Sequence, residues 1–445
     1  MGKVMPLAIL MVMITLLFIS WGNISKYNTR IKAQFNGYMT AAQEYEDKQI
    51  YVDAVMQYEK AFSLKPDDYD LAVKIKDLYA TLNNGGQYIE QYLAACEKLR
   101  KMNPAIAENH YVLINYYWDQ EAYDTAYEYL KAAQKHLPDD EEIKAKIRKI
   151  KGMYTTMSVG HEEFKGWCFT EENQNGTAVV VTDGKYGIVK SNNNTLLECL
   201  HEGAGPLADG VFAIKVNGEY YYADTSGNRK VVPDEPAEYL GPFNNGLALT
   251  KVGGLYGYID KKGKSHHIQF EEAGSFSNGV APVKLEGKWV MIDKNFNVVK
   301  NLVFEDILMD EYGFCSVYGV FFGKMDGKYH LYDVKGNNLS AAHCDGFEDA
   351  KLFASTQPAA VKRDGKWGYV NINGSIAMNP TFEDADSFNF GYGPFKENGK
   401  WGCISMTGER WIEPTFDHMS AFARNGLAQV EINGSDQFLK LNYYD

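Results

Sequence analysis

The sequence lacks the cysteine and histidine patterns that identify metal and redox sites. None of the six cysteines lies at C-x-x-C spacing to another, and none of the nine histidines belongs to an H-E-x-x-H segment. Without these spacings, no zinc site, thioredoxin-like centre or metalloprotease site is indicated. The cysteines also occupy unrelated positions along the chain, which argues against a disulfide framework. We therefore expect them to be reduced.

Positive charge is scarce as well. The chain has 45 Lys and Arg against 58 Asp and Glu, a net charge of -13. Phosphate binding needs clustered basic residues, so we expect no nucleic-acid partner. Gly263-Lys264-Ser265 imitates the end of a P-loop, but the glycine required at position 258 is Tyr258. No nucleophile motif stands out, and we interpret Glu271-Glu272 and Asp384/Asp386 as ordinary surface carboxylates. The chain is thus expected to be no enzyme and to need no cofactor.

One long stretch carries no charge at all. Residues 4–21 form an 18-residue apolar run, long enough to cross a membrane as a helix. A cleaved signal peptide is the alternative, but a good cleavage site is missing, which favours an uncleaved anchor. Positive charges flank the run on both sides and leave its orientation open. We expect a single-pass membrane protein whose soluble part is extracytoplasmic.

A helical segment follows over residues 33–150. Its apolar residues recur at helical spacing, and prolines close successive units at Pro66, Pro104 and Pro138. A pair of amphipathic helices is predicted before each proline, which cannot continue a helix. The pattern resembles a tetratricopeptide array of about three repeats. Such an array implies a concave groove that holds peptides; the alternative is a simple spacer.

The C-terminal two thirds repeat a short phrase, clearest in Asp364-Gly-Lys-Trp-Gly-Tyr and Asn398-Gly-Lys-Trp-Gly. One aromatic residue marks each copy, at separations of 34, 36, 33, 40, 38 and 34 residues; these structural anchors are Tyr186, Tyr220, Tyr256, Trp289, Tyr329, Trp367 and Trp401. A period in this range is typical of a repeat architecture. One aromatic per unit at a fixed position is what packing between units requires, so we interpret the anchors as core residues. The glycine that follows four of these aromatics is expected to allow close approach of a neighbouring backbone.

Two turns punctuate each unit. Asn-Gly or Asp-Gly precedes the aromatic, as in Asp364-Gly365, and predicts a type I′ hairpin turn. A second turn of the form Asp-x-x-Gly follows it, as in Asp260 to Gly263. In the fourth unit this glycine is replaced by Phe296, a residue that disfavours positive φ, so we expect a distorted loop there.

Residues 160–445 are therefore predicted to form antiparallel strands in about seven repeated units. A β-propeller of seven or eight blades is the best solution, because radial closure protects the sheet edges. An open superhelix of hairpins is the alternative. The last hairpin, Leu427 to Leu441, has no Trp-Gly, and we expect it to join strands from Glu163 to Thr170 to close the ring. The fold class is thus multidomain, α plus all-β.

The repeat segment resembles the WG-repeat, or KWG-repeat, family of bacterial proteins. Gly365-Lys-Trp-Gly-Tyr and Gly399-Lys-Trp-Gly carry the likeness, with support from Asn379-Pro-Thr-Phe and Glu413-Pro-Thr-Phe. Membership implies an interaction module without catalytic, cofactor-binding or metal-binding residues. We therefore expect a membrane-anchored scaffold for protein or peptide partners. The alternatives are an envelope protein that binds a glycan or small ligand at the centre of the β-domain, and a hydrolase with a site built from loops.

Overall fold

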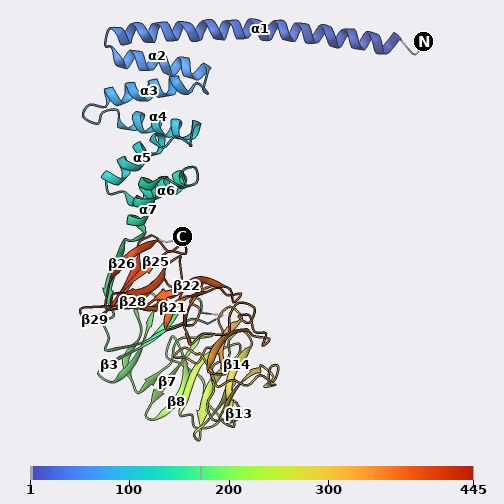
Figure 1. Cartoon of the computed structure of the whole chain (residues 1–445), viewed down its shortest axis with the longest axis vertical. Coiled ribbons are helices and arrows are strands. Elements are labelled where there is room, and N and C mark those ends of the chain that lie inside the picture. Colours follow the sequence, from blue (N-terminus) through green and yellow to red (C-terminus); the bar gives the residue numbers. More distant parts are fainter. Residues whose placement is uncertain (1–3, 171–172, 444–445) are drawn as a thin grey trace. The chain divides into compact units, whose positions relative to one another are not determined.

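A computed structural model describes residues 4–170 and 173–443, with side chains from residue 26 onward. The chain divides into two compact units, Met1–Ile150 and Lys151–Asp445. Figure 1 shows that the first unit is built of helices and the second of strands. The prediction of a multidomain protein with an α-helical and an all-β part is confirmed.

Seven helices make up the described part of the first unit: α1 (Val4–Asp47), α2 (Tyr51–Leu64), α3 (Tyr69–Leu82), α4 (Ile89–Met102), α5 (Glu108–Asp119), α6 (Tyr123–Gln134) and α7 (Glu141–Lys151). Successive helices turn back on each other (Figure 1). Pro66, Pro104 and Pro138 follow the ends of α2, α4 and α6, where a residue without an amide hydrogen stops a helix. The predicted helix pairs are confirmed, whereas their assignment as tetratricopeptide repeats stays a prediction.

Alanines bring the paired helices close together. Ala54 and Ala61 of α2 are completely buried, as are Ala126 and Ala133 of α6. The distance between helix axes depends on the size of the side chains at the contact, so alanine at these positions permits a short distance. The larger apolar residues of the unit, Phe62 among them, fill the core on either side of these contacts.

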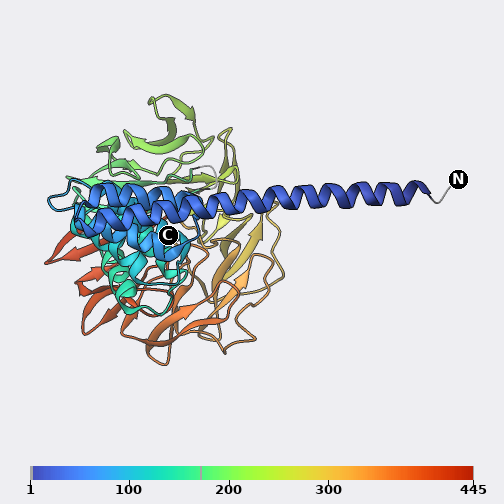
Figure 2. The same cartoon turned by 90° about the horizontal axis from the view of Figure 1, so that it is seen from above.

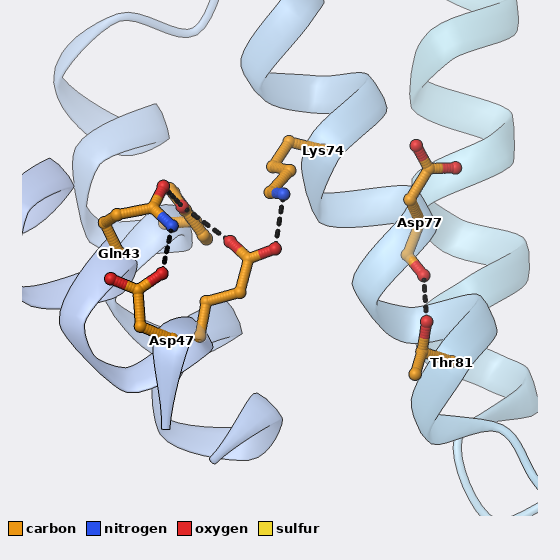
Figure 3. Close-up of polar contacts among 7 residues, drawn as sticks. Gln43, Asp47, Lys74, Asp77 and Thr81 are labelled. Carbon is orange, nitrogen blue, oxygen red and sulfur yellow. Dashed lines mark hydrogen bonds and ion pairs between the residues drawn. The ribbon is translucent and has the colours of Figure 1, made fainter. Parts of the chain in front are cut away.

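Polar contacts also join α1, α2 and α3. Glu46 of α1 accepts a hydrogen bond from the Tyr58 hydroxyl at 2.9 Å and pairs with Lys74 of α3, whose amine points toward that carboxylate in Figure 3. Burial, together with Glu46, raises the pKa of Tyr58 to about 12, so its hydroxyl remains a donor at neutral pH. Asp68 caps the start of α3 by accepting a hydrogen bond from the Leu71 amide at 3.1 Å.

The predicted membrane anchor, residues 4–21, falls outside the residues whose side chains the structure describes. In the part of the chain that was searched, no helix is both long and apolar enough to cross a membrane. Neither observation tests the anchor, which stays a prediction.

Eight antiparallel sheets make up the described part of the second unit, and we call the first seven of them blades one to seven in chain order. Their strands are, for blade one, β2 (Glu163–Cys168), β3 (Thr177–Thr182), β4 (Lys185–Lys190) and β5 (Thr195–His201); for blade two, β6 (Gly203–Ala204), β7 (Val211–Val216), β8 (Glu219–Asp224) and β9 (Arg229–Val231); for blade three, β10 (Tyr239–Asn244), β11 (Leu247–Val252), β12 (Leu255–Asp260) and β13 (Ser265–Phe270); and for blade four, β14 (Val280–Leu285) and β15 (Lys288–Asp293).

The remaining strands continue the same pattern: in blade five, β16 (Asp306–Ile307), β17 (Val320–Met325) and β18 (Lys328–Asp333); in blade six, β19 (Asp349–Ala350), β20 (Ala359–Arg363), β21 (Lys366–Val370) and β22 (Ile376–Phe382); in blade seven, β23 (Asp384–Ala385), β24 (Gly393–Glu397), β25 (Lys400–Ile404) and β26 (Arg410–Phe416). The eighth sheet, which we call the closing sheet, holds β27 (His418–Met419), β28 (Leu427–Ile432), β29 (Ser435–Leu441) and β1 (Tyr154–Ser158). Figure 2 shows the sheets following one another around a common centre.

The ring is closed, so the β-propeller is confirmed and the open superhelix is excluded. Phe438 of the closing sheet packs against Phe164 of blade one, with ring centres 5.0 Å apart, and against Trp167 at 5.7 Å. The seven blades that carry an aromatic anchor are thereby joined into a circle by the closing sheet. Circular closure leaves no sheet face exposed at the ends of the repeat array.

The strand that completes the closing sheet differs from our expectation. The Leu427–Leu441 hairpin does not pair with strands from Glu163 to Thr170. It pairs instead with β1, in a register that runs from Tyr154 opposite Leu441 to Ser158 opposite Gln437. The predicted partner residues instead form β2, the edge strand of blade one, which is hydrogen-bonded to β3. The first strand of the unit thus becomes the outer strand of its last sheet.

The predicted hairpin turns are present. Asp364 and Gly365 have φ angles of 52° and 73°, and Asn398 and Gly399 have 51° and 76°, as a type I′ turn requires. The glycine after the aromatic also behaves as expected. A Cβ atom at Gly368 would lie 2.6 Å from the carbonyl oxygen of Met378 on the next strand.

The distorted loop predicted at Phe296 is wrong. Phe296 takes the positive φ of its glycine counterparts, 64°, and its amide donates to the Asp293 carbonyl at 2.9 Å as theirs do. Its ring stacks on His267 at 4.0 Å and lies 5.8 Å from the Tyr258 ring. We infer that this packing offsets the backbone strain, which is on the order of 1–3 kcal/mol.

Candidate functional site: the propeller centre and the helical groove

The seven anchors lie in seven different blades, at the same place in each. Every one of them lies near the start of the strand that follows the hairpin turn, which is Asn-Gly or Asp-Gly in five blades, Gly253-Gly254 in blade three and Glu286-Gly287 in blade four. Trp289, Tyr329, Trp367 and Trp401 are buried, with 4–8% of their surface exposed, whereas the tyrosines of the first three blades are half-buried. The anchors are therefore spread around the ring, one per blade. Their role in packing stays a prediction that stability measurements can test.

A lysine faces the anchor across the strand pair in six blades, a feature that sequence reasoning missed. The six are Lys215, Lys251, Lys284, Lys324, Lys362 and Lys396. In blades two to five the ammonium group lies 5.0–5.8 Å from the centre of the aromatic ring, within cation–π distance. The sequence could have revealed this pairing, because a lysine stands five residues before each of these six aromatic residues.

Glutamates hold the hairpin turns of the same blades. In blades two to seven a glutamate side chain accepts a hydrogen bond from the turn glycine amide; the carboxylates belong to Glu202, Glu238, Glu271, Glu305, Glu348 and Glu383. Glu271 is therefore a turn-capping residue, more specific than the surface carboxylate we expected. These repeated charges are engaged within their own blades, which makes the turn end of the propeller a poor ligand site.

The propeller has a cavity of about 530 Å³ at its centre, which we call the central cavity. Its lining comes from blades one, three, four, five and six and from the closing sheet. Apolar rings such as Trp167, Phe314 and Phe353 alternate along its wall with amide and hydroxyl groups such as Asn278 and Ser316. Apolar walls with a few placed polar groups are typical of ligand-binding cavities.

An irregularity of blade five supplies one part of the cavity lining, which we call the floor, and we call the part around Arg424 the rim. Ile307 and Gly319 are 12 residues apart, whereas the corresponding Ala385 and Gly391 of blade seven are six apart. We call residues 308–316 the insertion. Its Tyr312 hydroxyl donates to the carbonyl of Gly166 at 2.9 Å and accepts from the Val179 amide at 3.3 Å. Both groups belong to blade one, so the insertion spans the ring.

Asp310 is the acidic residue that the insertion brings to the cavity. One carboxylate oxygen accepts hydrogen bonds from the amides of Tyr312 and Phe314, each at 2.9 Å. Asp310 is exposed and lines the cavity. Desolvation by the surrounding propeller raises the pKa of Asp310 to about 6. A carboxylate with a raised pKa in a cavity marks a candidate functional residue.

Arg424 of the closing sheet lies at the rim of the same cavity. Its guanidinium carbon is 5.6 Å from the centre of the Phe169 ring in blade one and 5.3 Å from that of Tyr318 in blade five. One guanidinium nitrogen donates to the Gln174 amide oxygen at 3.5 Å. The central cavity thus has an acidic group on its floor and a basic group at its rim.

The helical unit has an opening of its own, a groove of about 500 Å³ between α2, α3 and α4. The groove is lined mainly by apolar and small residues, with Glu59 and Lys98 as its charged members. Glu59 accepts a hydrogen bond from the Tyr79 hydroxyl at 2.7 Å, and the Lys98 ammonium lies 4.1 Å from the centre of the Phe62 ring. The sequence predicts a peptide-binding groove in this unit, and that role stays a prediction.

Buried polar groups elsewhere have structural partners. Asp386, predicted to be a surface carboxylate, is half-buried and accepts hydrogen bonds from the Ser387 and Ala421 amides at 2.7 and 2.8 Å. All six cysteines are free, as expected, and burial raises the pKa of the Cys168 and Cys315 thiols. Among the described residues, no group of three or more His, Cys, Asp or Glu side chains is arranged to hold a metal ion.

Comparison with known proteins finds one family. The family described as WG containing repeat matches residues 238–256, 256–289, 367–401 and 401–435. These matches cover blades three, four, six and seven, and they overlap or adjoin four of the anchors. No curated protein is similar enough in sequence to count as a relative.

Solved structures resemble the chain only distantly. Hsv2 of Kluyveromyces lactis is 10% identical with a TM-score of 0.34, over 63% of this chain and 98% of that one. A eukaryotic initiation factor is 12% identical with a TM-score of 0.38, over 57% and 77%. A chain of a mitotic checkpoint complex is 9% identical with a TM-score of 0.33, over 66% and 96%. At such values the likeness says nothing about function.

Proposed function

Because this chain is a member of the WG-repeat family, we propose that it is a non-enzymatic interaction scaffold for protein partners. The helical unit supplies the binding groove, and the propeller presents a second, rigid surface. The observation that carries the proposal is the apolar groove between α2, α3 and α4. Stacked helix pairs commonly bind extended or helical segments in this way.

The lining of the groove defines the occupant we propose: a partner segment with two or three apolar side chains and one acidic residue. Ala94, which is exposed, and Ala95, which is half-buried, offer apolar contact, and the buried Phe62 and Ile75 complete the apolar part of the lining. Met56 extends this surface along α2, with 49% of its area exposed. Glu59 is engaged by Tyr79, whereas the Lys98 ammonium faces only an aromatic ring. An acidic group of the partner would therefore complement Lys98 at the edge of an apolar contact.

Site-specific crosslinking tests this proposal on the full chain in intact cells. A photoreactive phenylalanine derivative is placed at Gln91, which lines the groove and is exposed, or at Thr81, which is exposed on α3 outside it. We expect a discrete adduct from position 91 and none from position 81. Lys98→Glu should abolish that adduct. The same adducts from both positions, or an adduct that Lys98→Glu leaves unchanged, would contradict the proposal.

We further propose that residues 4–21 anchor the scaffold in a membrane, with both units outside the cytoplasm. The support is the charge-free run of 18 apolar residues. Protease added to intact cells should then degrade the chain beyond residue 26, and the protein should stay in the membrane fraction after washing with alkaline buffer. Protection of the chain in intact cells, with digestion only after lysis, would show the opposite orientation.

A further inference from the structure

The geometry of the central cavity points to a second binding site, one for a small zwitterion that carries an ammonium and a carboxylate group. We propose that the ammonium group binds Asp310 on the floor and that the carboxylate binds Arg424 at the rim. This site is independent of the helical groove and does not rest on the function proposed above.

Asp310 needs a positively charged partner that the described residues do not provide. One carboxylate oxygen of Asp310 accepts hydrogen bonds from two backbone amides. Asp310 forms no ion pair with a described side chain. The negative charge of the neighbouring Glu311 disfavours ionisation of Asp310. The positive charge of Lys165 acts on Glu311 instead. Because Asp310 is exposed and lines the cavity, a cation that enters the cavity can form an ion pair with its carboxylate.

The walls beside Asp310 suit an organic ammonium group better than a metal ion. Phe314 and Trp167 line the cavity together with Phe353. Aromatic faces attract alkylammonium groups by cation–π interaction. A metal ion would instead need several oxygen ligands, and the described residues gather no such cluster. The floor therefore selects a carbon-rich cation.

Arg424 completes the site from the other side. Its guanidinium group lies within cation–π distance of the Phe169 and Tyr318 rings, while the described hydrogen bond to Gln174 uses one of its five N–H donors. A planar guanidinium with unused donors binds a carboxylate well. A ligand with a single positive charge would be repelled by Arg424, whereas a zwitterion satisfies both ends of the cavity.

The position of the site explains why blade five departs from the repeat. The insertion provides Asp310, Phe314 and Ser316, and Tyr318 just after it also lines the cavity. A regular blade, six residues shorter here, would supply neither the floor nor the acidic group. Structural closure of the ring does not require the insertion, because the other blades pack without one.

Calorimetric titration of the full chain tests the proposal with three zwitterions of increasing length: 4-aminobutyrate, 6-aminohexanoate and 8-aminooctanoate. We expect at least one of them to bind. The alkanoate and the alkylamine of the best chain length, which lack one of the two charges, should each bind at least tenfold more weakly. No binding of any zwitterion, or equal binding of the matched alkanoate, overturns the proposal.

Substitutions assign the two charges. Asp310→Asn, which keeps an acceptor for the two backbone amides, should weaken zwitterion binding at least tenfold and should not weaken alkanoate binding. Arg424→Gln should weaken zwitterion binding similarly and should strengthen alkylamine binding, because it removes a like charge. Glu311→Gln, one residue from Asp310 but outside the cavity lining, is the matched control and should bind as the wild type does. Unchanged affinity in Asp310→Asn, with an intact melting transition, rejects the site.

Discussion

At the scale of single residues, the buried anchors should dominate the stability of their blades. Trp367 is 5% exposed and packs beside Tyr369 and Phe388 in the core between blades six and seven. Trp367→Ala should lower the free energy of unfolding by about 3–5 kcal/mol, the usual cost for a buried aromatic residue. Urea denaturation followed by circular dichroism measures it. Tyr186→Ala, at a half-buried anchor, should cost clearly less; equal losses would contradict the packing role.

Asp310 should make stability depend on pH. Its folded-state pKa of about 6 lies above the ordinary value of 3.8, so the folded protein binds more protons than the unfolded chain between these values. Stability due to this group therefore falls as pH rises from about 4 to about 6. Asp310→Asn should melt at a higher temperature than the wild type above pH 7, with the difference shrinking toward pH 4.

Other titratable groups lie near Asp310 and define the control for that measurement. They are Glu311, Tyr312 and Cys315 of the same segment, Cys168 of blade one and Tyr239 of blade three. Only Glu311 is of a type that titrates in this pH range, and burial raises its pKa too. Glu311→Gln separates the two contributions. A wild-type and Asp310→Asn difference that is constant with pH would show that Asp310 is not desolvated.

At the scale of elements, the insertion acts as a brace across the ring. Tyr312→Phe removes the hydroxyl that bonds Gly166 and Val179 and leaves two backbone groups of blade one without that partner. The expected loss is about 1–3 kcal/mol, with faster hydrogen exchange of the Val179 amide. Tyr318→Phe is the matched control, because that ring is 44% exposed. Equal exchange rates of the Val179 amide in wild type and Tyr312→Phe would show that the Tyr312 hydroxyl does not stabilise blade one.

The elements also show which features a sequence can reveal. The turns were predictable because Asp364-Gly365 and its counterparts determine their own backbone conformation locally. The insertion left only a long spacing of 40 residues, without indicating where the extra chain goes. The strand Tyr154–Ser158 has no turn signature and is assigned only by its long-range pairing with β29. The central cavity draws on residues from 164 to 429, so no local pattern could identify it.

At the scale of the whole molecule, the joint between blade one and the closing sheet should control cooperativity. Phe438 is fully buried there against Phe164 and Trp167. Phe438→Ala should cost about 3–5 kcal/mol and lower the melting temperature of the propeller as one transition, since every sheet depends on closure. Calorimetry would show this. A new, separate low-temperature transition would mean that the closing sheet unfolds on its own.

The pairing of β1 with β29 has a consequence for synthesis on the ribosome. Residues 154–158 emerge early, but their partner strand, residues 435–441, is translated almost three hundred residues later. Throughout that interval the growing chain holds completed blades and an unpaired first strand, an edge open to wrong partners. A premature stop codon anywhere before the final hairpin would therefore leave the propeller open. Chaperones and proteases would act on the truncated protein.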